Sequence, residues 1–146
     1  MPSSIGYEFG TPVTLESNGG AITSGSILAT TNIYDPTGDT QKYTEGNLTV
    51  TYTFGTAPVD NTVIEIHATI STDGTNYTDA PTSTVQPAEG FVGGLNVAAV
   101  TTARRRGLRG IRLSGHRTQF YLRNTTGQSI SAGWTAVFTP RRRLAS

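Results

Sequence analysis

The stretch LTVTYTF at residues 48–54 decides the fold, because its apolar side chains alternate with threonines. Successive residues of a strand point to opposite faces, so this pattern predicts a β-strand with one buried face. Residues 63–71, VIEIHATIS, predict a second strand with isoleucines on one face and polar side chains on the other. The Asp-Gly pair at 73–74 is typical of a tight turn, and we expect it to join this strand to the segment around Tyr77 as a hairpin.

Similar alternation returns toward the end of the sequence. It occurs at residues 111–113, 119–123 and 134–138. No segment keeps a helical period, and some seven or eight short strands separated by turns indicate an all-β chain. We expect one antiparallel β-sandwich of the jelly-roll or immunoglobulin-like type. Its expected parts are an extended N-terminal arm with the first edge strands at 1–45, the core at 46–140 and a basic tail at 141–146.

The composition agrees with short strands and many turns. Among 146 residues there are 26 Thr, 17 Gly and no Cys. Threonine favours strands and glycine favours turns, and the lack of cysteine excludes disulfides, thiolate metal sites and a cysteine nucleophile. The first residues lack the pattern of a secretory signal, and no apolar run reaches the length of a membrane span. We therefore expect folding in a reducing cytoplasm and no membrane partner.

The charges are divided between the two parts of the sequence. Residues 1–103 hold one lysine and all ten carboxylates, a formal charge of −9, and residues 104–146 hold ten arginines, +10. Such a division indicates either a partner of opposite charge or a self-complementary assembly. The alternative is that strands of the two parts interleave in one sandwich, which would blur the division in space.

The arginines are the candidate interface residues. They are Arg104, Arg105, Arg106, Arg109, Arg112, Arg117, Arg123, Arg141, Arg142 and Arg143. We expect a basic loop at 104–110, a tail at 141–143 and strand positions for Arg112 and Arg123. Arginine binds carboxylate or phosphate in a bidentate manner. Stacking aromatics are not interleaved with these arginines, which argues against nucleic acid and favours acidic protein surface, including a second copy of the chain.

Sites for catalysis are sparse. His67 and Glu65 share a predicted strand face and could bind a metal only with a third ligand from elsewhere; a structural histidine is the preferred interpretation. No nucleophile elbow, phosphate-binding loop or dinucleotide fingerprint occurs, and the carboxylates lie mostly in turns. We expect no enzyme activity, no cofactor, no metal and no small-molecule substrate.

Two segments resemble small β-sandwich structural proteins of tailed bacteriophages. Residues 120–140, FYLRNTTGQSISAGWTAVFTP, resemble their closing hairpin, in which an Asn-x-Thr-Gly turn precedes an Ala-Gly-Trp strand. Residues 66–79 are similar to their central hairpin. The resemblance covers roughly residues 48–140, and residues 1–45 contribute nothing to it.

The resemblance implies a virion component assembled in the host cytoplasm. Its first implication is a capsid decoration (cement) protein that forms a homodimer or homotrimer and clamps neighbouring major capsid subunits. The alternatives are a neck, tail or receptor-binding virion protein, and a carbohydrate-binding β-sandwich that uses Trp134 and Tyr77. For the last, the alternation of Trp134 with Ala136 and Phe138 favours a core position instead.

Overall fold

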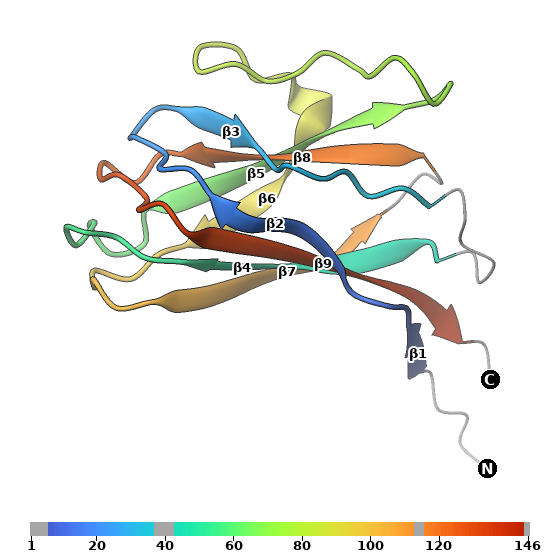
Figure 1. Ribbon diagram of the computed structural model, residues 1–146, viewed down its shortest axis with the longest axis horizontal. Helices are drawn as coiled ribbons and strands as arrows, with labels where there is room; N and C mark the ends of the chain where they lie inside the picture. Colours follow the sequence, from blue (N-terminus) through green and yellow to red (C-terminus); the bar gives the residue numbers. More distant parts are fainter. Residues whose placement is uncertain (1–5, 37–42, 113–115, 145–146) are drawn as a thin grey trace.

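The computed structural model describes residues 6–36, 43–112 and 116–144, which form nine strands in two packed antiparallel sheets (Figure 1). The strands are β1 (Gly6–Phe9), β2 (Val13–Gly19), β3 (Ile27–Ala29), β4 (Glu45–Tyr52), β5 (Val63–Ser71), β6 (Phe91–Asn96), β7 (Arg104–Arg112), β8 (Arg117–Asn124) and β9 (Trp134–Leu144). One short 3-10 turn, η1 (Ala88–Gly90), precedes β6. The all-β prediction is confirmed. No helix in the described ranges is long and apolar enough to cross a membrane.

The strand order is that of a jelly roll. One sheet has the order β2-β9-β4-β7, with β1 also pairing with β9, and the other has the order β3-β8-β5-β6. The antiparallel pairs β2–β9, β3–β8, β4–β7 and β5–β6 nest inside one another, as in a long hairpin that has been rolled up. This nesting selects the jelly roll over the immunoglobulin-like alternative.

The core lies between the inner faces of the two sheets. On β4, Leu48 and Val50 are buried and alternate with half-buried threonines, as their period of two predicts. Phe138 of β9 lies at the centre, with its ring centroid 4.8 Å from that of Tyr34 and 5.5 Å from that of Phe120 on the other sheet. Offset aromatic contacts of this kind add to the stabilisation from area burial.

The sandwich extends beyond the expected limits of 46–140 at both ends. Leu15, Ile22 and Tyr34 belong to the buried cluster, so the region expected as an arm supplies part of the core. Weak periodicity hid this contribution, because short strands and isolated bridges bury single residues rather than a continuous stripe. At the other end β9 runs to Leu144 and pairs with β1, so residues 141–143 are strand residues where a tail was expected.

Residues 104–110, expected as a loop, form most of β7. Seven residues of β7 pair with β4, with a bulge at Arg109-Gly110. The prediction failed because arginine and glycine carry no strand signal, whereas pairing with β4 satisfies the backbone of the segment.

The polar face of β5 is also more buried than expected. His67, Thr69 and Ser71 are buried although they alternate with the apolar side chains. The ring of Phe91 lies 5.5 Å from that of His67. The segment after β5 turns back beside it, with a bridge from Ser71 to Tyr77, and then runs along the outer side of this sheet (Figure 1). The hairpin expected at residues 73–74 is thereby confirmed.

Candidate protein-binding surface

Four of the ten arginines form ion pairs with carboxylates from the other part of the sequence. The pairs are Glu8–Arg142, Glu45–Arg141, Glu65–Arg123 and Asp35–Arg117. They form because strands from the two parts are neighbours: β1 and β4 flank β9, and β5 lies beside β8. The interleaving alternative therefore holds for these four pairs, and the division of charge along the sequence is partly cancelled in space.

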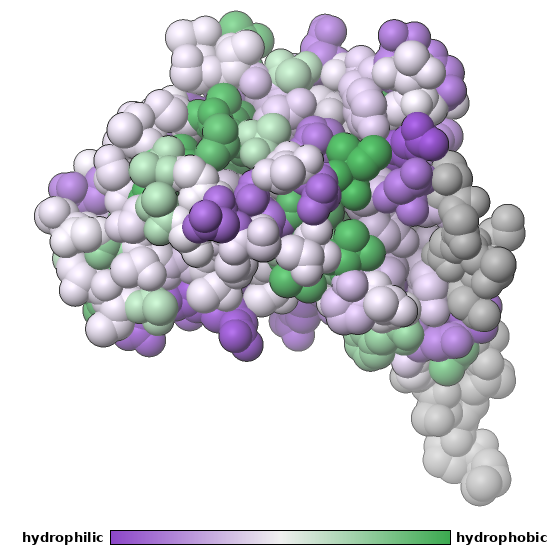
Figure 2. Space-filling view, in the orientation of Figure 1, coloured by the Kyte–Doolittle hydropathy of each residue, from purple (hydrophilic) through white to green (hydrophobic). Residues whose placement is uncertain are grey.

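The other six arginines make no ion pair with any carboxylate in the described ranges. They are Arg104, Arg105, Arg106, Arg109 and Arg112 on β7, and Arg143 on β9. We call the first five the β7 arginines. β7 is an edge strand, and four of these five side chains are exposed. Hydrophilic residues lie along the lower edge of the molecule in Figure 2, where Figure 1 draws β7. The net positive charge left after pairing is concentrated on this one sheet.

Aromatic and arginine side chains gather where β1 pairs with the end of β9. The guanidinium carbon of Arg141 lies 3.9 Å from the centre of the Tyr7 ring, a cation–π geometry. Phe9 is 55% exposed beside them on β1. Arg112 and Arg143 line a hollow of about 500 Å³ together with Tyr7, Thr44 and Glu45. We call Tyr7, Phe9, Arg112, Arg141 and Arg143 the terminal patch.

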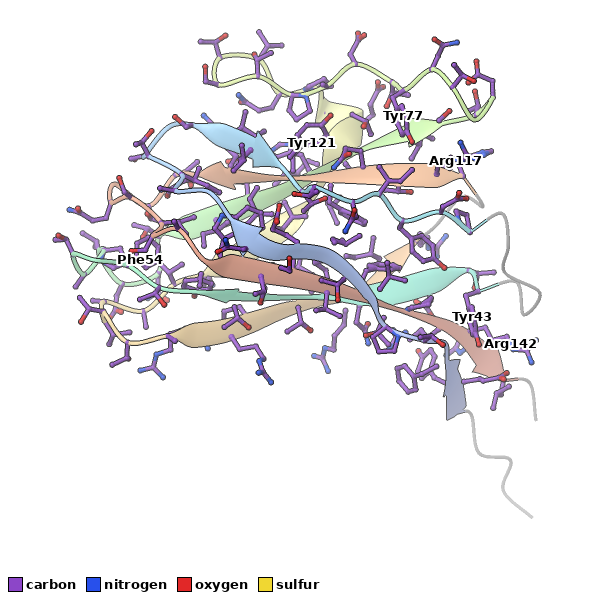
Figure 3. The ribbon with its side chains drawn as sticks, in the orientation of Figure 1. Tyr43, Phe54, Tyr77, Arg117, Tyr121 and Arg142 are labelled. Atoms are coloured by element: carbon purple, nitrogen blue, oxygen red, sulfur yellow. The ribbon has the colours of Figure 1, made fainter. Side chains whose placement is uncertain are left out.

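Strand register places the terminal patch on the outer face of its sheet. Glu45 of β4 stands opposite Arg112 on one side and Arg141 on the other, and Tyr7 stands opposite Arg143. In Figures 1 and 3, β1 and the end of β9 project past the rest of the sandwich, with Arg142 labelled near the tip. Tyrosine and arginine on an exposed projection are the residues that most often dominate the affinity of protein interfaces.

A cleft of about 640 Å³ opens between the two sheets on the β6–β7 side. Its apolar lining includes Ile70, Phe91, Val92, Leu108 and Ile111. Its polar lining includes Asp79 and Glu89 on one wall and Arg109 and Arg112 on the other. No sequence pattern predicted this cleft, because it exists only when residues 104–112 form a strand opposite β6.

The His67–Glu65 pair is part of a side-chain network rather than an open ligand set. His67 Nε2 lies 3.1 Å from one carboxylate oxygen of Glu65, and Arg123 Nη1 donates to the other at 2.9 Å. Within the described residues no three His, Cys, Asp or Glu side chains are grouped to hold a metal. The network links β5 to β8 on the outer face of their sheet.

Trp134 occupies the core. It is buried and its indole N–H donates to the carbonyl of Gly20 at 2.7 Å. The core position that its alternation favoured is confirmed, and the ring offers no face for stacking on a sugar.

Tyr77 remains partly exposed next to the turn that Asp73 organises. There Asp73 Oδ1 accepts hydrogen bonds from the backbone N–H groups of Asn76 and Thr75, at 2.7 and 2.8 Å. These bonds hold the pKa of Asp73 well below its usual range.

The ten candidate arginines do not form one patch. Arg112, Arg141 and Arg143 meet in the terminal patch, residues 104–106 lie at the far end of β7, and Arg117 and Arg123 belong to the other sheet.

Neither a known family model nor a curated protein matches the chain. Tyr7 and Phe9 were missed as interface candidates, although two aromatics flanking a glutamate in a polar segment were a readable signal.

Proposed function

We propose that the chain is a virion structural protein of the capsid decoration (cement) type, which acts by binding and not by catalysis. In this proposal it is assembled in the host cytoplasm, forms a homodimer or homotrimer, and clamps neighbouring major capsid subunits in the virion. The observation that carries the proposal is the terminal patch, in which exposed aromatics and arginines share a projecting pair of strands.

The chemistry of this patch suits an acidic protein surface. Three arginines there face only one carboxylate, that of Glu45, so the patch has an excess of positive charge. An acidic surface would complete the pairing, and complementary charge would guide encounter and orientation. Tyr7 and Phe9 would supply the apolar contact that charges alone do not give. The resemblance of residues 120–140 to bacteriophage β-sandwich proteins supports the choice of a capsid as that surface.

The test is binding of the purified chain to capsid shells that lack it. We expect bound copies in electron micrographs, a higher melting temperature of the shells, and weaker binding as salt rises. The oligomeric state is measured separately by analytical ultracentrifugation. Absence of shell binding at low salt would reject the decoration role. Binding to host cells or glycans in its place would favour the receptor-binding alternative.

Two matched pairs of variants test the terminal patch itself. Phe9→Asp is compared with Val59→Asp, and Tyr7→Ala with Tyr77→Ala; Tyr7 and Tyr77 are 39% and 38% exposed. We expect the patch variants to bind shells about thirtyfold more weakly, the effect of losing about 2 kcal/mol at one dominant contact residue. The control variants should bind like the unmodified chain. Equal losses in both members of each pair would contradict the assignment.

A further inference from the structure

The outer edge of β7 is open for pairing. In the described part of the chain β7 pairs only with β4, so the backbone groups along its other edge have no strand partner. Such an edge can accept a further strand by main-chain hydrogen bonding. The bulge does not block this edge, because the Gly110 N–H is directed to Asn47 Oδ1 of β4 at 3.1 Å.

The charge on β7 selects against a second β7 as that strand. A copy of β7 would bring its own arginines against the β7 arginines, and like charges placed opposite each other destabilise a strand pair. Arg105 and Arg112 stand opposite Thr51 and Glu45, which places them on the outer face of the sheet. Acidic side chains on an added strand would meet them there.

The inner face of the same edge requires apolar side chains. Near one end the sandwich is closed by Arg106, whose Nε donates to the carbonyl of Asn96 on β6 at 3.2 Å. At the other end the cleft lies open between Leu108 and Ile111 of β7 and Val92 of β6. Val92 is half-buried there, against the edge of the core. Because side chains of a strand alternate, a strand added to β7 would direct every second side chain into this cleft.

We propose that the β7 edge and the cleft bind an extended protein segment of alternating acidic and apolar residues by strand addition. Its apolar side chains fill the cleft against Leu108 and Val92, and its acidic side chains lie beside the β7 arginines on the outer face of the sheet. Asp79 and Glu89 on the opposite wall of the cleft disfavour a uniformly acidic chain or a phosphate backbone. This site shares Arg112 with the terminal patch and otherwise uses different residues, and it does not depend on the chain being a virion protein.

The experiment uses a synthetic nine-residue peptide of alternating valine and glutamate, matched to the nine residues of β7, with capped ends and a fluorescent label. The first comparison peptide is a block isomer in which the valines and glutamates are separated. The other two are N-methylated analogues of the alternating peptide, one methylated at the backbone nitrogen of every valine and one at that of every glutamate. Affinities are measured by fluorescence anisotropy with the full chain. Backbone N–H groups of alternate residues point to the same edge of a strand. Only one of the two methylated analogues should therefore lose the hydrogen bonds to β7.

We expect the alternating peptide to bind at least about tenfold more tightly than the block isomer. One of the two methylated analogues should bind no more tightly than the block isomer. Val92→Asp and Arg109→Glu should each weaken binding about tenfold or more, whereas the exposed control Val85→Asp should leave it unchanged. The proposal would be overturned if the alternating peptide did not bind, or if the block isomer or single-stranded DNA bound as tightly. It would also be overturned if the two methylated analogues bound alike. Self-association of the chain that Arg109→Glu abolishes would overturn it as well.

Discussion

Replacing Asn124 with alanine should destabilise the fold strongly, because this buried side chain holds the turn after β8 to the N-terminal part of the chain. Its amide donates to the carbonyls of Ile22 and Gln128 at 2.8 and 2.6 Å. Its oxygen accepts from the backbone N–H and the hydroxyl of Thr126 at 3.0 and 2.6 Å. The residue is the Asn of the Asn-x-Thr-Gly turn at residues 124–127, and its hydrogen bonds hold this turn in place.

The size of the effect follows from these four hydrogen bonds. Each buried bond contributes about 1 kcal/mol net. The carbonyl of Ile22 also accepts from Ile130 N–H. The Thr126 hydroxyl, which donates its one proton to Asn124, lies 3.0 Å from the carbonyl of Gln128 and can donate to it in Asn124→Ala. Four bonds are lost and one is regained, so the expected loss is roughly 3 kcal/mol. With a urea dependence of about 2 kcal/mol per molar, the unfolding midpoint should fall by about 1.5 M.

The assay is equilibrium unfolding in urea, followed by the fluorescence of Trp134, which is the single tryptophan and is buried. Asn96→Ala is the control, because the Asn96 side chain is exposed and makes no hydrogen bond among the residues described; its effect should stay within about 0.5 kcal/mol. A loss below about 1 kcal/mol for Asn124→Ala would refute the reasoning, since it would mean that water replaces the bonds without cost.

Three further substitutions test other parts of the fold by the same unfolding assay, followed by circular dichroism. Burial raises the pKa of Glu16, but hydrogen bonds outweigh this effect, so the pKa is lowered overall. The carboxylate therefore stabilises the fold above pH 4.5, and this contribution is lost as the pH falls further. Glu16→Gln should lower the free energy of unfolding at neutral pH, and its difference from the unmodified chain should shrink on acidification. Trp134→Phe loses the hydrogen bond to Gly20 and part of the buried ring, and should cost about 2 kcal/mol or more. Gly46→Ala places a methyl group 2.2 Å from the Phe138 ring and should cost about 1–3 kcal/mol by overpacking; a neutral result would show that the ring can move aside.

The four strands β4, β5, β8 and β9 were predictable because their side chains alternate. The period of two in residues 48–54 survives in the structure as alternate buried and half-buried positions. The prediction was weakest where pairing, rather than side chains, makes the strand. Residues 104–110 have the composition of a loop and become β7 only because β4 offers a partner.

The candidate surfaces could be predicted only in their composition. The arginines are visible in the sequence, but which of them are neutralised depends on register between distant strands, as when Glu8 meets Arg142. The burial of His67 was likewise unreadable, because the packing of Phe91 against its ring depends on the return of the chain after a loop. Local patterns describe faces of strands and leave open which strands meet.

The position of β9 has a consequence for the order in which the chain can fold during its synthesis. β9 lies between β1 and β2 on one side and β4 on the other, yet it is the last strand along the sequence. Until Trp134–Leu144 leave the ribosome, β1 and β2 lack the strand with which they pair in the structure, and the core lacks Trp134, Ala136 and Phe138. The sandwich therefore cannot complete its fold before β9 has been synthesised, and folding is slowed by contacts that join distant parts of the chain. A chain that ends before residue 134 lacks the middle of a sheet, so such unfinished copies should remain unfolded and be exposed to proteolysis.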